Sequence, residues 1–225
     1  FVVGDFNNWQ VSEEYQLKQD GNYFWIELTG LTPQKEYAMQ YVVVRSDGVV
    51  KRISDLFSEK VVHSDDQWEP MTVDPTLMPY PQEAAAYATV IQTGKPAFQW
   101  SDATLNFKSK KKNNLVIYEL WVYDHTQHRS IAGLMDRLQY FEDMGVNAIE
   151  LMPVTEFDGN ENWGYSPNHY FALDKAYGTP EQMKTFVDEC HKRGIAVILD
   201  MVFNHSTGLN PMNKLYPYGD DLKYN

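Results

Sequence analysis

Two segments of the chain bring together side chains that suit a polar ligand such as a sugar. The first, residues 162–170, contains Trp163, Gly164 and Tyr165 together with amide and imidazole groups. Aromatic rings match the apolar faces of a sugar, whereas amides, imidazoles and carboxylates match its rim of hydroxyls. Gly164 allows the backbone to turn sharply or to approach a ligand closely. The alternative interpretation is a loop that is packed by its own aromatic side chains.

The second segment, residues 200–205, follows an apolar run and contains Asp200, Asn204 and His205. An ionised aspartate at the end of an apolar strand costs free energy unless it is paired or hydrogen-bonded, so Asp200 indicates a polar site. His205 has a ring nitrogen that can donate to a hydroxyl, and Asn204 offers an oxygen to a hard cation such as calcium. The alternative is that Asp200 bonds backbone amides and His205 is a satisfied core histidine.

Three strands that alternate with two helices are expected to position these segments. Ser130 is predicted to cap the first helix, and Thr179 and Gln182 to form a capping box at the start of the second. Short helix-to-strand turns indicate parallel strands with right-handed crossovers. The predicted strands span residues 115–123, 147–152 and 195–201. Each segment follows a strand. The two are therefore expected to lie side by side at the carboxyl edge of the strands, where parallel barrels carry their active sites.

The chain before residue 115 has a different character. Residues 1–73 contain short aromatic and β-branched runs separated by turn signals such as Asp20-Gly21, which predicts an antiparallel sandwich. Residues 74–114 carry four prolines and a group of lysines without sustained periodicity, which favours a linker. Residues 115–225 form the third predicted region, where the single cysteine, Cys190, is expected to be a buried apolar side chain.

Composition excludes some classes of partner. The net charge of −12 argues against nucleic acid or an anionic membrane as the main partner, and no apolar run reaches the length of a membrane span. The single cysteine excludes an internal disulfide. The chain begins on an extended run without an initiator methionine or a signal-like segment, so both ends are expected to be cuts in a longer protein. Compartment and oligomeric state stay open.

At residues 200–205 the pattern resembles the first signature of the α-amylase family, glycoside hydrolase family 13: an Asp, three mostly apolar residues, then Asn-His. The aromatic loop resembles the Trp-Gly-Tyr-x-Pro segment of the branching and debranching members. Further resemblances follow the family's order. Residues 116–120 and 149–154 resemble its first and second barrel strands, and residues 177–180 resemble its entry to the next helix. Residues 4–9 resemble the start of the isoamylase-like N-terminal sandwich.

The resemblance implies an all-β immunoglobulin-like sandwich followed by the first part of a (β/α)8 TIM barrel, which is incomplete in this chain. It implies retaining cleavage or transfer of α-glucosidic bonds in starch- or glycogen-like glucans. By the same resemblance, Tyr165 stacks on the sugar next to the scissile bond and His205 bonds a hydroxyl of that sugar. Asp200 supports the site, and Trp163 is a substrate contact. Asn204 occupies a position that binds Ca²⁺ in some members, and no other cofactor is expected.

The resemblance also places the nucleophile and the general acid beyond residue 225, because retaining enzymes need two carboxylates and the family takes them from later strands. Glu150 and Asp200 match neither signature and are not expected to be that pair. One alternative is a non-catalytic glucan-binding protein with a degenerate barrel. An unrelated α/β enzyme would need a phosphate-binding glycine loop, which the sequence lacks. Hydrolysis or transfer, and α-1,4 or α-1,6 bonds, stay open.

In some family members the N-terminal sandwich binds glucan. Trp9 and Trp25 are the residues there that would stack on a sugar, but packing in the core is the favoured expectation for both, because a tryptophan buries a large apolar area.

Overall fold

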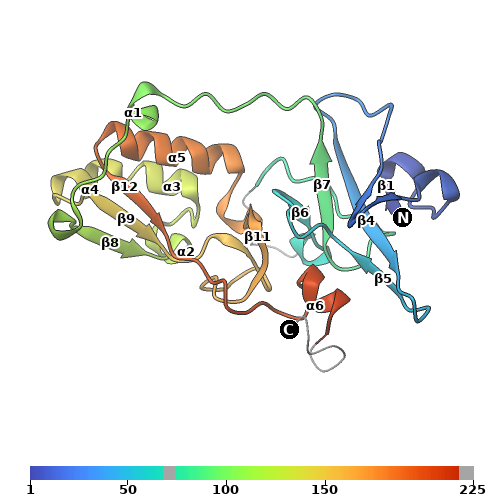
Figure 1. Cartoon of the computed structure of the whole chain (residues 1–225). Coiled ribbons are helices and arrows are strands. Elements are labelled where there is room, and N and C mark those ends of the chain that lie inside the picture. Colours follow the sequence, from blue (N-terminus) through green and yellow to red (C-terminus); the bar gives the residue numbers. More distant parts are fainter. Residues whose placement is uncertain (68–73, 218–225) are drawn as a thin grey trace.

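The structure is a computed structural model that describes residues 1–67 and 74–217. An antiparallel sheet built from the first part of the chain lies on one side, and a unit of parallel strands covered by helices lies on the other (Figure 1). An extended segment between β7 (Ala88–Gln92) and α1 (Asp102–Leu105) runs along the outside and joins the two. The expected boundary at residue 73 and the final residues 218–225 lie outside the described residues.

The N-terminal sheet has the order β1-β4-β7-β6, and a further strand, β5, pairs with β4. All of its pairings are antiparallel, as the sequence predicts. A separate hairpin forms at the Asp20-Gly21 turn. The strands other than β7 are β1 (Val2–Gly4), β2 (Lys18–Asp20), β3 (Tyr23–Trp25), β4 (Glu36–Val44), β5 (Val50–Ile53) and β6 (Val61–Val62).

The sequence prediction of a linker over residues 74–114 was wrong at β7. This strand pairs with β4 on one side and β6 on the other, so it is a central member of the sheet. Of the two tryptophans, Trp9 packs in the core of this region, as expected. Trp25 lies on the separate hairpin with about half of its surface exposed, and Lys18 Nζ stands 5.2 Å from its ring centroid, so the expected core packing was wrong for Trp25.

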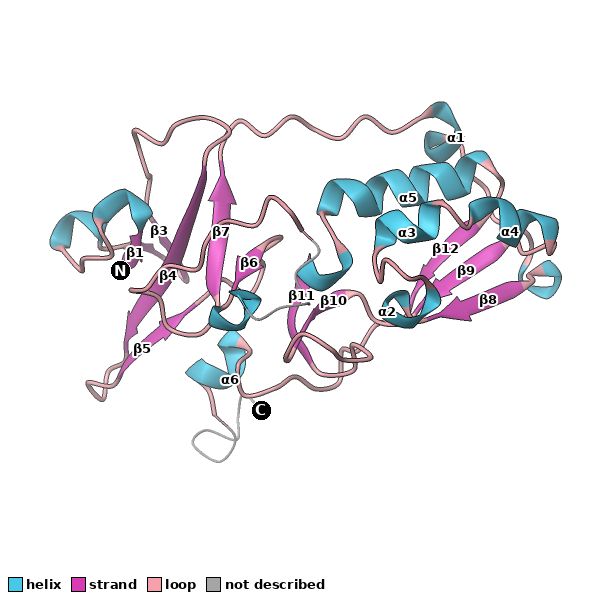
Figure 2. Ribbon diagram, turned by 180° about the vertical axis from the view of Figure 1, so that it is seen from behind, coloured by secondary structure: helices cyan, strands magenta, loops and turns pink. Residues whose placement is uncertain are grey.

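The parallel unit contains β8 (Ile117–Leu120), β9 (Ala148–Leu151) and β12 (Ala196–Leu199) in the order β12-β9-β8. Four helices accompany these strands: α2 (Val122–His125), α3 (Ile131–Met135), α4 (Leu138–Asp143) and α5 (Pro180–Lys192). Helices α3, α4 and α5 cover one face of the sheet (Figure 2). The three parallel strands therefore confirm the predicted alternation of strand and helix.

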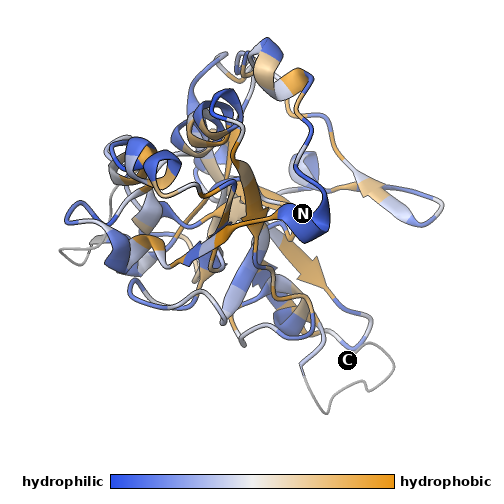
Figure 3. Ribbon diagram, turned by 90° about the vertical axis from the view of Figure 1, so that its left-hand side faces the viewer, coloured by the Kyte–Doolittle hydropathy of each residue, from blue (hydrophilic) through white to orange (hydrophobic). Residues whose placement is uncertain are grey.

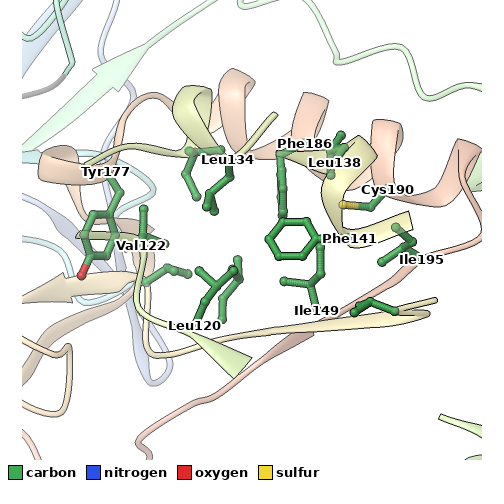
Figure 4. Packing of buried hydrophobic residues seen from close by; sticks show 14 of the residues in the cluster. Leu120, Val122, Leu134, Leu138, Phe141, Ile149, Tyr177, Phe186, Cys190 and Ile195 are labelled. Atoms are coloured by element: carbon green, nitrogen blue, oxygen red, sulfur yellow. The ribbon is translucent and has the colours of Figure 1, made fainter. Parts of the chain in front are cut away.

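The core of this unit lies between the helices and the covered face of the sheet (Figure 4). Phe141 and Phe186 from two helices meet Ile149 of β9, and all three are fully buried. Burying one side chain of this size contributes about 1.5–3 kcal/mol. Cys190 belongs to the same cluster, and burial raises the pKa of its thiol to about 12. It is therefore the apolar core residue that the sequence predicts.

Both predicted helix starts are confirmed. Ser130 Oγ accepts a hydrogen bond from Gly133 N at 3.2 Å. At the start of α5, Thr179 Oγ1 accepts from Gln182 N at 3.1 Å, and Gln182 Oε1 accepts from Thr179 N at 2.8 Å. The first predicted helix is nevertheless interrupted between α3 and α4. There Arg137 N donates a hydrogen bond to Leu134 O, three residues earlier, at 2.9 Å.

The segment after β9, which includes the aromatic loop singled out in the sequence, contains the antiparallel pair β10 (Thr155–Phe157) and β11 (Pro167–Leu173). The hairpin lies between the N-terminal sheet and the parallel unit in both ribbon views (Figures 1 and 2). Its register shifts twice, and it buries the polar residues Glu156, Asn168 and His169. It therefore lacks the alternation of apolar and polar residues that identifies a strand in sequence.

Buried polar contacts join the hairpin and the residues just after it to the N-terminal region. Lys175 Nζ pairs with Asp66 Oδ1 at 3.1 Å and also with Glu156. Burial opposes the charge on Lys175, but the attraction of Glu156 and Asp66 outweighs it and raises the lysine pKa. Ser54 Oγ lies 2.8 Å from His169 Nε2. Burial lowers the pKa of His169 to about 3, so its ring is neutral at pH 7.

Surface loops are mostly hydrophilic, whereas the strands in the centre of the molecule are hydrophobic (Figure 3). Within residues 1–67 and 74–217, none of the helices has both the length and the apolar character needed to cross a membrane. The remaining helices are α6 (Pro211–Leu215) and five short 3-10 turns: η1 (Asp5–Asn7), η2 (Glu13–Tyr15), η3 (Ser64–Gln67), η4 (Lys112–Asn114) and η5 (Lys175–Tyr177).

Candidate functional site

The two segments singled out in the sequence leave the parallel sheet at the same edge. Strands β9 and β12 are hydrogen-bonded neighbours in register, from Ala148 beside Ala196 to Leu151 beside Leu199. The chain after β9 forms the β10–β11 hairpin, whose connecting loop carries Trp163 and Tyr165. The chain after β12 carries residues 200–205. Parallel pairing therefore places both segments at the carboxyl edge of the sheet, as predicted.

Tyr165 contacts two of the other predicted residues, Asp200 and His205. Tyr165 OH donates a hydrogen bond to Asp200 Oδ2 at 2.7 Å, and His205 Nε2 donates to the backbone oxygen of Tyr165 at 2.8 Å. A carbonyl oxygen only accepts, so Nε2 of His205 carries the hydrogen in this arrangement. Tyr170 OH donates to the backbone oxygen of His205 at 3.1 Å, which ties the two segments together a second time. The prediction that they lie side by side is confirmed.

Asp200 and His205 differ from their alternative interpretations. Asp200 is only partly buried, and its carboxylate accepts from a side chain. His205 is exposed, so the interpretation as a core histidine was wrong. The fully buried histidine of this region is His169. The site therefore offers an imidazole and a carboxylate at the surface, where a ligand can reach them.

Tyr165 stays protonated under ordinary conditions. The hydrogen bond to Asp200 is the largest of the causes that raise its pKa to about 12, followed by burial and by the negative charges of Asp200, Glu119 and Glu150. The residue as a whole is 37% exposed. The hydroxyl is therefore held by the carboxylate while part of the ring stays open, which suits stacking on an apolar face of a sugar.

Gly164 sets the path of the loop. Its φ is +91°, and a Cβ at this position would lie 2.2 Å from the backbone oxygen of Pro153. Only glycine fits such a close approach with this backbone conformation. Gly164 N also donates to Asn162 Oδ1 at 2.9 Å. The loop is thus pressed against the chain that leaves β9, and this contact places Tyr165 toward Asp200.

Trp163 lies beside a second tryptophan near the site. Its ring meets Trp121 edge to face, with centroids 6.3 Å apart, and 61% of its surface is exposed. Trp121 is fixed by hydrogen bonds from its ring nitrogen to Tyr177 OH at 2.8 Å and to Asn162 O at 3.1 Å. The alternative of a loop packed by its own aromatics fails for Trp163, because its ring is mostly open to solvent.

The calcium role predicted for Asn204 stays a prediction. Calcium takes 6–8 oxygen ligands, and carboxylates usually supply several of them. Asn204 is exposed, and no three His, Cys, Asp or Glu side chains converge as metal ligands anywhere in the described part of the chain.

Sequence reasoning missed several residues that support the site. Glu119 stands next to Glu150 in the register of β8 and β9, and both contribute to the pKa of Tyr165. Tyr87 and Asn168 are buried between the N-terminal sheet and the hairpin, where they share a hydrogen bond. Asn168 had a signal, since it lies in the aromatic loop segment. Tyr87 had none, because it falls in the segment expected to be a linker.

Comparison with known proteins gives consistent similarities. Residues 107–214 match the catalytic domain of α-amylases. The chain is 36% identical over 179 residues to a malto-oligosyltrehalose trehalohydrolase of Saccharolobus solfataricus, covering 79% of this chain and 30% of the relative. It is 28% identical over 215 residues to the 1,4-alpha-glucan branching enzyme GlgB of Lactobacillus acidophilus, covering 91% and 30%. The chain thus spans about a third of the length of these relatives.

Solved structures show the same similarity. A Salmonella typhimurium protein assigned as an alpha amylase superposes with a TM-score of 0.66 at 26% identity, covering 88% of this chain and 30% of that one. The pullulanase SAP of group B Streptococcus, solved in complex with maltotetraose, superposes with a TM-score of 0.56 at 27% identity, covering 77% and 26%. The parallel unit and the sheet before it are thus arranged as in proteins of this kind.

Proposed function

The chain belongs to the α-amylase family, and we propose from this premise that it is part of an enzyme that cleaves or transfers α-glucosidic bonds in starch- or glycogen-like glucans. The observation that carries the proposal is the contact of Tyr165 with both Asp200 and His205. An open aromatic ring, a carboxylate and an imidazole then converge at the carboxyl edge of parallel strands, which is where barrel enzymes bind their substrates.

Each site residue has a proposed task. The Tyr165 ring stacks on the sugar next to the scissile bond, and His205 bonds a hydroxyl of the same sugar. Asp200 holds the Tyr165 hydroxyl and so fixes the tilt of the ring. Trp163 offers a second aromatic surface, and its large exposed area supports this role. These residues bind and orient the glucan, while Asp200 stays a supporting group because its carboxylate is engaged by Tyr165.

The bond-breaking groups are proposed to lie outside this chain. A retaining mechanism uses a carboxylate nucleophile and a carboxylic general acid about 5–5.5 Å apart. Glu119 and Glu150 are adjacent in register on neighbouring strands, but neither matches the family's signatures for those roles. By the same proposal, the three parallel strands are part of an eight-stranded barrel, and the antiparallel N-terminal sheet belongs to an immunoglobulin-like sandwich domain.

The proposal is tested by kinetics on the full-length parent protein. Tyr165→Ala is expected to lower kcat/KM on soluble starch, glycogen or pullulan by about 10- to 100-fold, because a buried aromatic contact contributes about 1.5–3 kcal/mol. Release of reducing ends and analysis of branch points measure hydrolysis and transfer. Tyr23→Ala is the matched control, since Tyr23 lies on the separate β2–β3 hairpin and is 78% exposed. It should leave the kinetics unchanged.

Two outcomes would contradict the proposal. Wild-type kinetics for Tyr165→Ala would remove the assigned role of that ring. A parent protein that binds α-glucan without any turnover would favour the alternative of a non-catalytic glucan-binding protein with a degenerate barrel. The 225-residue chain by itself is expected to show no turnover, because the proposed nucleophile and general acid are not among its residues.

A further inference from the structure

Tyr87, a buried residue outside the site, connects the N-terminal sheet to the β10–β11 hairpin. Tyr87 directly precedes β7 and is 3% exposed. Its hydroxyl donates to the backbone oxygen of Phe157 at 3.1 Å and accepts from Asn168 Nδ2 at 3.2 Å. Its ring is enclosed by His63 and His169, with centroids 4.4 and 4.9 Å away. The position of this hydroxyl is therefore fixed by packing on several sides.

Asn168 carries the connection from Tyr87 to both segments of the site. Its side-chain oxygen accepts from the Thr207 hydroxyl, and its backbone oxygen accepts from Asn210 Nδ2 at 2.8 Å. Thr207 N also donates to Pro167 O at 3.2 Å. Asn168 follows Tyr165 by three residues and Thr207 follows His205 by two. One fully buried amide thus holds together the two short stretches that end in the Tyr165–His205 contact.

We propose that Tyr87 is a positioning residue for the glucan site, so that the N-terminal sheet sets the alignment of Tyr165 and His205. This inference rests on the proposed function. Without the Tyr87 hydroxyl, the amide of Asn168 and the oxygen of Phe157 each lose a partner in a place that water does not readily reach. A buried group without a partner is costly, so the hairpin shifts to recover one. A shift of about 1 Å at a substrate-positioning side chain is enough to lower turnover strongly.

The test is a double-mutant cycle in the full-length parent protein. Tyr87→Phe removes the hydroxyl and keeps the ring, and it is expected to lower kcat/KM for maltotetraose by about tenfold. In a Tyr165→Ala background the same change is expected to cost less than about threefold, because residues that act through one another are not additive. Tyr41→Phe is the matched control. It removes a hydroxyl that bonds Asp55 at 3.3 Å on the same sheet.

Equal losses in both backgrounds would overturn the inference, since a general loss of stability acts regardless of Tyr165. Wild-type kinetics for Tyr87→Phe would overturn it as well. If Tyr87→Phe does not fold, Thr207→Val takes its place in the same double-mutant cycle. It removes the hydroxyl that donates to the side-chain oxygen of Asn168. If the wild-type parent shows no turnover, the proposed function fails, and the cycle is measured instead as Kd for maltotetraose by calorimetry. Additive effects on Kd would then refute the positioning role.

Discussion

Replacing Gly164 by alanine should disable the site without removing any group that touches the substrate. The Cβ of Gly164→Ala would lie 2.2 Å from the backbone oxygen of Pro153 and 2.7 Å from its Cβ. Ordinary contact begins near 3.4 Å, so the loop must move by about 1.2 Å from Pro153. Alanine at a φ of +91° adds about 1–2 kcal/mol of backbone strain. Since Tyr165 is the next residue, this movement should pass directly to its ring.

The expected result in the full-length parent protein is a fall in kcat/KM of about 100-fold, which is the loss that a 1 Å misplacement can cause. Steady-state kinetics on maltotetraose measures it, and thermal unfolding records the accompanying loss of stability. Gly159→Ala is a matched control, because Gly159 lies in the same loop with a φ of +76° and has open space around its would-be Cβ. It should show the strain in its unfolding temperature and nearly normal kinetics.

The reasoning is refuted if Gly164→Ala and Gly159→Ala have the same kcat/KM. That result would mean that the contact with Pro153 does not hold the loop, and that Tyr165 finds its place by other means. Normal kinetics combined with a lowered unfolding temperature in Gly164→Ala would lead to the same conclusion.

Two further predictions concern stability. The pKa of His169, about 3 in the folded chain, lies below the ordinary value, so the unfolded chain binds more protons between these values. The free energy of unfolding should therefore fall as the pH drops below about 6.5, by up to about 1.4 kcal/mol per pH unit. In His169→Gln, urea unfolding at pH 7, 6 and 5 should show a flatter dependence; an unchanged slope would disprove the assignment. Thr179→Ala removes the cap of α5 and should cost about 1 kcal/mol in urea unfolding. Thr185→Ala, in the same helix, should change stability by less than about 0.5 kcal/mol, and equal effects of the two changes would contradict the capping role.

Local signals explain which parts of the structure the sequence predicts. The capping box of Thr179 and Gln182 depends on residues three apart, and it forms as expected. The meeting of Tyr165 with His205 follows from the rule that neighbouring parallel strands end at the same edge. The first depends on neighbouring residues alone, and the second requires only that β9 and β12 pair in parallel.

The missed features depend on contacts between distant parts of the chain. Strand β7 is short and lies among prolines, and only its pairing with β4 and β6 makes it a strand. The β10–β11 hairpin buries Glu156 and His169. The free-energy cost of burying them is offset because Lys175 pairs with Glu156 and Ser54 hydrogen-bonds His169. Without those partners, burial of such groups would cost too much. A single-sequence pattern does not show partners of this kind.

The order in which the hairpin and the N-terminal sheet leave the ribosome has a consequence for synthesis. The strands of the sheet are complete at Gln92, but His169, which contacts Ser54, and Lys175, which lies over the Tyr87 ring, are translated much later. At about 5–20 residues per second the delay is roughly 4–17 s. During this interval Ser54 and Tyr87 of the nascent sheet lack their final neighbours. Docking of the hairpin is therefore a late step in biogenesis, and variants that weaken it should reduce the yield of folded protein.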